Sequence, residues 1–234
     1  MSTFDAIANY YDDSVLNGRF NHDDVVKRLI PFVKQYPTFI ADLASGTGGM
    51  AGALHKKWPS AKIVCEEPSL AMTKLLKEKF PDFSIHNKTL QETQITSQDL
   101  VTIAFNSINY IESSALPSVF KRINSGMNNG GILYFDAITK ESALSMLDGK
   151  PFLEKISKRG KLTVCSRLTP EVLFHRFSID NKVLEDHSQY LVSKQEYLEL
   201  LSEAQFDVLH IQTLLGTLRT EFVCKSVDKC VSKK

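Results

Sequence analysis

Residues 38–49 read TFIADLASGTGG, and they indicate how this chain folds. Thr38–Leu43 is a short apolar run that is typical of a buried strand. Small residues and glycines follow at once, and a helical pattern then covers Met50–Trp58. Glycine permits positive φ and lets a ligand approach the main chain. We therefore expect a tight turn between strand and helix whose backbone N–H groups bind a ligand, and the alternative is a plain turn.

The same alternation of strand and helix continues outward from this turn. Upstream, Asn21 or Asp23 is expected to cap a helix that runs to about Tyr36, and downstream Asn129-Gly130-Gly131 is expected to be a turn. Strands that alternate with helices at this spacing predict an α/β fold with a parallel sheet covered on both faces. The expected strands are Lys62–Cys65, Phe83–His86, Gln98–Asn106 and Gly131–Ala137, and the expected helices are Ser69–Phe80 and Ala115–Ser125.

The pattern changes after Thr139. Asp180-Asn181 suits a two-residue hairpin turn, because both residue types tolerate a left-handed backbone. The surrounding runs predict a small antiparallel β insert, and Ser193 with Glu196 forms a capping box for a further helix. The runs with partial alternation are Lys161–Leu168, Glu171–Ile179 and Val183–Val192, and two last strands are expected at Asp207–Gln212 and Thr220–Lys225.

Composition argues against several classes of protein. The chain has 234 residues with 28 basic and 27 acidic side chains, so it lacks the basic surplus that binding a nucleic-acid backbone requires. No apolar run reaches the length of a membrane span, and the acidic start MSTFDAIANYYDD differs from a secretory signal. Four scattered cysteines without a C-x-x-C pair suggest neither a zinc site nor a disulfide framework. We expect a cytoplasmic protein, a monomer or a homodimer, that uses no metal.

Asp42 bears on the kind of ligand. Gly46–Ala51 fits the G-x-G-x-x-A pattern of dinucleotide sites, and Glu66 and Glu67 follow about 20 residues later. A carboxylate at the mouth of a pyrophosphate site would repel the phosphates, whereas it would attract the ammonium group of an adenosyl amino acid. S-adenosylmethionine carries an ammonium and a sulfonium but no phosphate. The order of acid before glycines therefore favours this ligand.

Asp42–Gly48 resembles the first motif of the class I S-adenosylmethionine-dependent methyltransferases, with Ala44 in place of the first glycine. The resemblance implies a Rossmann-like, seven-stranded, mostly parallel sheet, in which Ser45, Gly46, Thr47 and Gly48 bind the cofactor. Glu67-Pro68-Ser69, followed by Met72, resembles the second motif. The acid of that motif accepts hydrogen bonds from the two ribose hydroxyls, and Glu66 is the alternative to Glu67.

Two further segments continue the resemblance. The family places an acid near Thr89; here Thr89 is expected to accept a hydrogen bond from the adenine amino group, and Leu90 to offer its backbone N–H. Asp99–Tyr110 resembles the fourth motif, whose strand runs beneath the methyl-donor sulfur. The resemblance places Phe105, Asn106 and Ser107 near the cofactor. It makes Asn109 and Tyr110 catalytic candidates that face either the acceptor or the helix behind it.

The insert is similar to that of one subgroup of this family, in which a small β-sheet covers the acceptor pocket. The subgroup includes sugar-amine N-methyltransferases. A tyrosine near the N-terminus covers the bound cofactor in this subgroup, which makes Tyr11 a cofactor-binding candidate. An acceptor that loses a proton needs a base, and His175 and His187 are the candidates on the insert, whereas Arg176 suits an anionic acceptor.

Together these features predict an enzyme that moves a methyl group from S-adenosylmethionine to a nitrogen or oxygen of a small-molecule acceptor and leaves S-adenosyl-L-homocysteine. Residues 1–148 and 191–225 are expected to form the methyltransferase core, 149–190 a lid over the acceptor site, and 226–234 a flexible tail. Two alternatives stay open. One is an NAD(P)-dependent oxidoreductase on a doubly wound fold, and the other is a non-catalytic S-adenosylmethionine-binding sensor.

Overall fold

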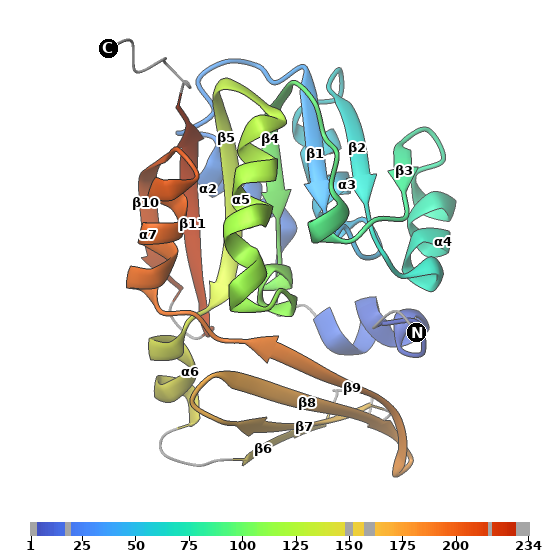
Figure 1. The fold of residues 1–234 in the computed structure, drawn as a ribbon. Helices are drawn as coiled ribbons and strands as arrows, with labels where there is room; N and C mark the ends of the chain where they lie inside the picture. The colour runs from blue at the N-terminus through green and yellow to red at the C-terminus, as the bar shows by residue number, and fades with distance from the viewer. Residues whose placement is uncertain (1–3, 17–19, 148–151, 157–161, 215–216, 228–234) are drawn as a thin grey trace.

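Seven strands form the central sheet of the computed structural model, in the order β10-β11-β5-β4-β1-β2-β3 (Figure 1). The structure describes residues 4–16, 20–147, 152–156, 162–214 and 217–227. Strands β1 to β5 pair in parallel, and β11 runs antiparallel to both β5 and β10. The predicted seven-stranded, mostly parallel sheet is therefore confirmed. Its strands are β1 (Phe39–Leu43), β2 (Lys62–Glu66), β3 (Ser84–His86), β4 (Gln98–Ile103), β5 (Met127–Ile138), β10 (Phe206–Thr213) and β11 (Arg219–Ser226).

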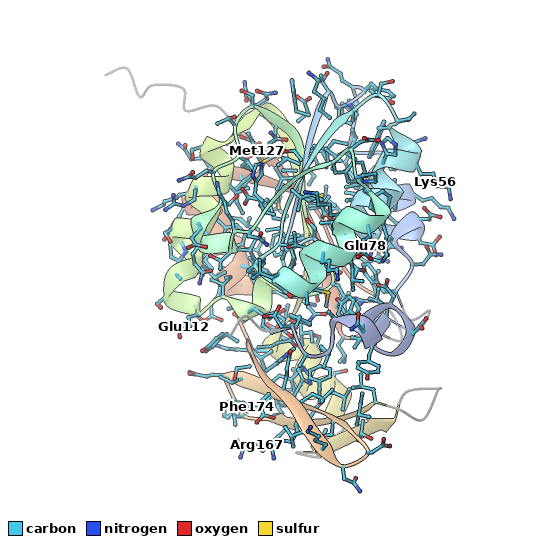
Figure 2. The ribbon with its side chains drawn as sticks, turned by 90° about the vertical axis from the view of Figure 1, so that its right-hand side faces the viewer. Lys56, Glu78, Glu112, Met127, Arg167 and Phe174 are labelled. Atoms are coloured by element: carbon cyan, nitrogen blue, oxygen red, sulfur yellow. The ribbon has the colours of Figure 1, made fainter. Side chains whose placement is uncertain are left out.

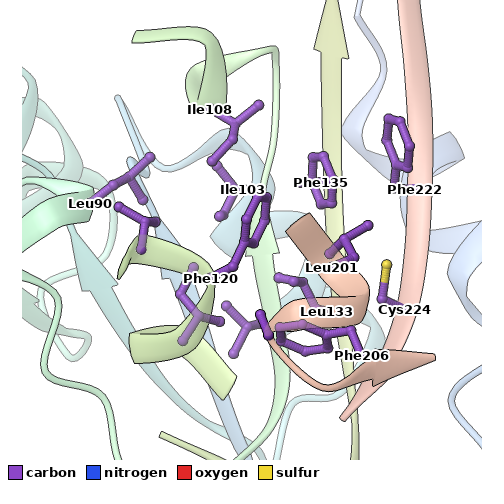
Figure 3. Packing of buried hydrophobic residues seen from close by; sticks show 14 of the residues in the cluster. Leu90, Ile103, Ile108, Phe120, Leu133, Phe135, Leu201, Phe206, Phe222 and Cys224 are labelled. Atoms are coloured by element: carbon purple, nitrogen blue, oxygen red, sulfur yellow. The ribbon is translucent and has the colours of Figure 1, made fainter. Parts of the chain in front are cut away.

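Helices cover both faces of this sheet. On one face α2 (His22–Leu29), α3 (Gly49–Lys57) and α4 (Leu70–Lys79) contribute to a single apolar cluster with β1, β2 and β4. On the other face α5 (Leu116–Ser125) and α7 (Lys194–Glu203) pack against β4, β5 and β11. Figure 3 shows this second cluster, in which the rings of Phe135 and Phe222 stack at 4.6 Å. Burial from both sides explains why β1 and β4 read as nearly continuous apolar runs.

A four-stranded antiparallel sheet follows β5 and α6 (Lys140–Leu147) (Figure 1). Three of its strands match the predicted insert, and Asp180 and Asn181 adopt φ of 48° and 63° in the predicted hairpin turn. In the side view of Figure 2, Arg167 and Phe174 lie on this sheet, and the guanidinium is 4.9 Å from the ring centre. The fourth strand, β6, was not predicted. The strands are β6 (Phe152–Ile156), β7 (Thr163–Leu168), β8 (Val172–Ile179) and β9 (Lys182–Tyr190).

The N-terminal segment lies between the two sheets. It comprises residues 4–16, with α1 (Ala8–Tyr10) and the π-helical turn η1 (Tyr11–Leu16), and Figure 1 shows it beneath the carboxyl ends of β1 and β2. Because ligands of open α/β sheets bind beside the carboxyl ends of the strands, this segment covers the expected ligand site. Three short 3₁₀ turns complete the core, η2 (Leu90–Glu92), η3 (Ser107–Tyr110) and η4 (Ser113–Ala115).

Two local predictions were wrong. The first core helix ends at Leu29 rather than near Tyr36, because Pro31 has no N–H to donate to the preceding turn. Asn129-Gly130-Gly131 is not a turn between elements but a bulge inside β5, where the pairing moves from Gln98–Met127 to Leu100–Ile132. Gly130 supplies the positive φ of 78° that this bulge requires. The predicted tail begins at Ser226, which the structure places in β11, and residues 228–234 lie outside the described residues.

Candidate active site

The glycine-rich turn connects β1 to α3. Ala44, Gly46 and Gly48 all have positive φ, of 54°, 56° and 87°. The turn is anchored to β2, since the N–H of Ser45 donates to the carbonyl of Glu66 at 3.1 Å. A Cβ on Gly48 would lie 2.3 Å from Leu76 Cδ1 of α4. Gly48 therefore allows α4 to pack closely against the turn.

Asp42 is buried directly behind the turn, and 1% of its surface is exposed. Its Oδ1 accepts a hydrogen bond from Thr102 Oγ1 at 2.7 Å, and its Oδ2 accepts one from the N–H of Ala51 at 3.1 Å. Burial raises the pKa of Asp42 to about 7, although these hydrogen bonds lower it. A positively charged ligand group next to Asp42 would lower this pKa and so favour the ionised carboxylate.

Glu67 follows the end of β2 and faces the same turn. Its Oε2 accepts from the N–H of Gly46 and its Oε1 from the N–H of Ser69, both at 2.9 Å. Each carboxylate oxygen has a second lone pair, so both oxygens can still accept from the two ribose hydroxyls. Burial raises the pKa of Glu67 to about 6. The neighbouring Glu66 points elsewhere, with its Oε1 3.9 Å from Lys88 Nζ.

Two adjoining cavities follow this edge of the sheet, with about 730 and 340 Å³ of open space. Tyr11, Ala44, Gly46 and Ser107 line both of them. No lysine or arginine is found among the described residues that line them, so a ligand with two phosphates would lack a counter-charge. The larger cavity is also lined by the predicted residues Glu67, Pro68, Met72, Thr89, Leu90 and Tyr110, and the smaller by Asp42, Ser45, Thr47 and Phe105.

Three acidic side chains attach the N-terminal segment to the rest of the molecule. Two of them, Asp5 and Asp12, belong to the segment, and the third, Glu185, belongs to the insert. Asp5 Oδ1 accepts from Ser69 Oγ at 2.6 Å, and Asp12 accepts from Thr47 Oγ1 at 2.5 Å. The carboxylate of Glu185 on β9 accepts from the backbone N–H groups of Phe4 and Ala6. Sequence patterns do not reveal these pairings, because the partners are 35 to 181 positions apart.

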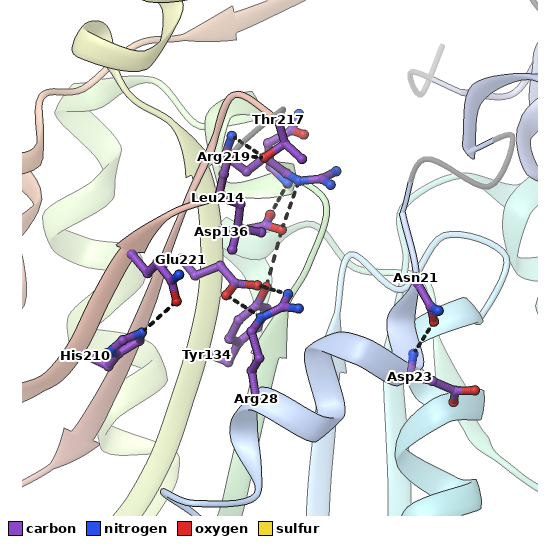
Figure 4. Close-up of polar contacts among 12 residues, drawn as sticks. Asn21, Asp23, Arg28, Tyr134, Asp136, His210, Leu214, Thr217, Arg219 and Glu221 are labelled. Atoms are coloured by element: carbon purple, nitrogen blue, oxygen red, sulfur yellow. Dashed lines mark hydrogen bonds and ion pairs between the residues drawn. The ribbon is translucent and has the colours of Figure 1, made fainter.

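Phe105 and Asn106 follow β4 with positive φ of 58° and 50°. The N–H of Asn106 donates to Asp136, so Asn106 is tied to the end of β5 and does not line either cavity. The guanidinium of Arg219 lies 5.0 Å from the ring centre of Phe105, and its Nε is 3.7 Å from Asp136 Oδ2 (Figure 4). Asp136 and Arg219 therefore support the loop that carries Phe105. Neither residue was predicted from the sequence.

Asn109 does not fit the predicted role of facing an acceptor. Its surface is 0% exposed, its Nδ2 donates to the carbonyls of Ile138 and Tyr190, and its Oδ1 accepts from the N–H of Ile138. The amide therefore joins the core to the insert, and it is buried away from both cavities. His175 also lies outside both cavities, with its ring nitrogens bonded to Ser166 at 2.7 Å and Gln189 at 3.0 Å.

Tyr110 and His187 are brought together, although they are 77 residues apart. Tyr110 lines the larger cavity, and its hydroxyl is 3.0 Å from Nδ1 of His187. His187 is buried, and its Nε2 is 2.6 Å from Oε2 of Glu185. Arg176 pairs with Asp186 on the exposed side of the insert and lines neither cavity. Of the predicted catalytic residues, only Tyr110 lines the cavity.

Among the residues that the structure describes, no group of three or more histidine, cysteine, aspartate or glutamate side chains lies close enough to hold a metal ion. No helix among them is both long and apolar enough to cross a bilayer.

Known proteins share the sequence pattern and the fold. Residues 40–131 match the family model of a methyltransferase domain. A ubiquinone/menaquinone biosynthesis C-methyltransferase of Campylobacter jejuni is 24% identical over 243 residues, which cover 96% of each chain. The fold is similar to an S-adenosylmethionine-dependent methyltransferase of Clostridium acetobutylicum, with TM-score 0.78, 17% identity and coverage of 97% of this chain and 100% of that one. A sugar N-methyltransferase of Streptoalloteichus gives TM-score 0.73 and 20% identity over 94% and 92%.

Proposed function

Because this chain is a class I S-adenosylmethionine-dependent methyltransferase, we propose that it methylates a nitrogen or oxygen of a small-molecule acceptor bound between the core and the insert. The observation that carries the proposal is the carboxylate of Glu67, held by two backbone N–H groups at the wall of the larger cavity. Two lone pairs remain on it for a pair of neighbouring hydroxyl groups, as a ribose presents them.

The remaining cofactor contacts follow from the same geometry. The larger cavity, lined by Pro68, Met72, Thr89 and Leu90, suits the adenosine part, and the smaller cavity, backed by Asp42, suits the amino-acid part with its ammonium group. The ring of Tyr11 lies over Gly46, 3.9 Å from where a Cβ would be, and would cover the bound cofactor. S-adenosylmethionine supplies an electrophilic methyl group, so these residues chiefly bind, orient and exclude water.

An acceptor carbon is the second candidate. The Campylobacter relative that matches this chain over 96% of its length is named a C-methyltransferase of ubiquinone and menaquinone biosynthesis. The insert of this chain, by contrast, favours a compact polar acceptor, because Tyr110 and the buried His187 meet beside the cavity. An acceptor with an N–H or O–H group can hydrogen-bond to a polar side chain at this position, and Tyr110 and His187 are suited to take the proton that it loses on methylation.

Turnover with defined acceptors tests the proposal. The protein would be incubated with S-adenosylmethionine and, separately, an amino sugar, a catechol and a 1,4-naphthoquinol, and S-adenosylhomocysteine would be quantified. Product mass and NMR then identify the methylated atom. We expect turnover with the amino sugar or the catechol, whereas methylation of a quinol ring carbon alone would favour the second candidate.

Calorimetry separates the two other classes of function. Strong binding of NADPH without any heat from S-adenosylmethionine would refute the methyltransferase in favour of an oxidoreductase. Tight binding of S-adenosylmethionine without turnover of any acceptor would instead support a sensor.

A further inference from the structure

His187 forms the middle of a buried chain of three polar side chains. Its Nδ1 is 3.0 Å from the hydroxyl of Tyr110, and its Nε2 is 2.6 Å from Oε2 of Glu185. His187 is 1% exposed, and its ring packs against the rings of Phe4 and Phe177, with ring centres at 4.5 and 4.6 Å. This close packing leaves the imidazole little freedom to turn, so its two nitrogens keep these partners.

The partners of His187 determine which nitrogen carries its proton. An ionised carboxylate only accepts hydrogen bonds, so Nε2 must be protonated to donate to Glu185. In the neutral imidazole Nδ1 is then an acceptor, and the hydroxyl of Tyr110 donates to it. The chain therefore runs from the hydroxyl of Tyr110 through His187 to Glu185, with every donor directed the same way.

Glu185 also holds the N-terminal segment. Its Oε2 accepts from the N–H of Phe4 at 2.7 Å, and its Oε1 accepts from the N–H of Ala6. The same segment carries Tyr11, which lines both cavities. One carboxylate thus fixes the orientation of His187 and fastens the segment that covers the site.

We propose that Tyr110 receives the proton which the acceptor loses during methyl transfer, that His187 takes the hydroxyl proton of Tyr110, and that Glu185 is the positioning residue for both His187 and the N-terminal segment. The inference rests on the proposed function, because Tyr110 acts only on an acceptor that is bound between the core and the insert, beside His187. It adds Glu185 to the site and gives the N-terminal segment a role in aligning the base.

The proposed step is balanced in atoms and charge. The acceptor atom forms its bond to the methyl group with its own lone pair, and the electron pair of the broken sulfur–carbon bond stays on sulfur. The proton of the acceptor moves to the oxygen of Tyr110 while the hydroxyl proton of Tyr110 moves to Nδ1 of His187. His187 becomes an imidazolium, whose charge is offset by the carboxylate of Glu185.

The surrounding charges fit this resting state. Burial lowers the pKa of His187 more than Glu185 and Asp186 raise it, which leaves the ring neutral and able to accept a proton near pH 7. Burial also raises the pKa of Tyr110, against a hydrogen bond with Gln189 that lowers it, so the phenol keeps its proton at rest.

Nitrogen-15 NMR of the wild-type protein tests the arrangement without any acceptor. We expect His187 to be neutral at pH 7 with its proton on Nε2. In Glu185→Gln this preference should weaken, whereas Asp186→Asn, the matched change at the next and exposed residue, should leave it intact. A charged ring, or a proton on Nδ1, would overturn the inference.

Kinetics test the role in the reaction. Tyr110→Phe removes only the hydroxyl, and we expect kcat to fall about 100-fold, in the range of general acid–base catalysis, while the Kd of S-adenosylhomocysteine changes less than twofold. Tyr190→Phe, which removes a half-exposed hydroxyl from the same strand as His187, is the matched control and should keep the wild-type kcat. If Tyr110→Phe turns over as fast as the wild-type protein, the proton relay is refuted and the proposed function is not. If the wild-type protein itself turns over no acceptor, the proposed function is refuted.

Discussion

Replacing Glu67 by glutamine gives the sharpest test of the cofactor site. The carboxylate of Glu67 accepts two backbone N–H groups at 2.9 Å and has two lone pairs left for a ligand. Glutamine keeps one oxygen and brings an NH₂ group in place of the other. The NH₂ group cannot accept from either a backbone N–H or a ribose hydroxyl, so the ligand loses at least one charge-assisted hydrogen bond.

The size of the effect follows from that single bond. A hydrogen bond to a charged group contributes about 1.5–3 kcal/mol, and about 1.4 kcal/mol corresponds to a tenfold change in Kd. We therefore expect Glu67→Gln to raise the Kd of S-adenosylhomocysteine by about 10- to 150-fold. The turn itself also loses one acceptor, because the N–H of Gly46 or of Ser69 must face the new NH₂ group.

Isothermal titration calorimetry at pH 8 measures this change. The pKa of about 6 leaves Glu67 ionised at that pH, so the comparison is between a charge and a neutral amide. Glu66→Gln is the matched control: its side chain is equally buried, but it points toward Lys88 and lines neither cavity. If a folded Glu67→Gln protein binds within twofold of wild type, or if Glu66→Gln shows the larger loss, the assignment of the ribose site is refuted.

Three further predictions concern the same edge of the sheet. Ala44→Gly should stabilise the protein by about 1 kcal/mol in urea unfolding, because a φ of 54° strains alanine by about 1–2 kcal/mol. The extra freedom of glycine in the unfolded chain offsets only part of this gain, and a loss of stability would contradict the prediction. Gly48→Ala should destabilise the protein by about 2–5 kcal/mol, since strain adds to a clash with Leu76, whereas Gly130→Ala, with positive φ but open space around it, should cost only the strain. Asp42 has a pKa of about 7 against an ordinary 3.8, so its carboxyl group binds a proton in the folded protein that the unfolded chain has released. The contribution of Asp42 to stability should therefore fall as the pH rises from 4 to 8, by at most about 4 kcal/mol, and urea unfolding should show the stability of wild type relative to Asp42→Asn fall over this range.

Local sequence was sufficient for the elements of the core. The apolar run 38–43 and the glycines after it predicted β1 and the turn. A strand that is buried on both faces is apolar along its length, and a turn with positive φ favours glycine. The capping box of Ser193 and Glu196 and the hairpin at Asp180-Asn181 were equally readable, since both depend on residues within three positions of each other. The failures were local too, as Pro31 ends a helix whose apolar pattern continues past it.

The acids around the glycine-rich turn were largely visible in the sequence, and the polar contacts of the insert were not. Asp42 lies at the end of one predicted strand and Glu67 lies just after the next. Parallel strands bring their carboxyl ends to one edge, so the proximity of the two acids follows from chain order alone. Nothing local distinguishes His175 from His187, which face each other on neighbouring strands. Only the packing of the insert against Tyr110 and Phe4 selects His187 and buries it.

The sequence by itself therefore determined the fold, the turn and the two acids, because hydrophobic periodicity, glycine and strand order act over short distances. The tertiary structure alone decided which polar groups meet across the core, the insert and the N-terminal segment. Contacts such as Glu185 with Phe4, 181 residues apart, depend on how two sheets and a covering segment pack together. A hydrogen bond is specific only once both partners are held in place, and in this protein it is the packing of these three parts that holds them.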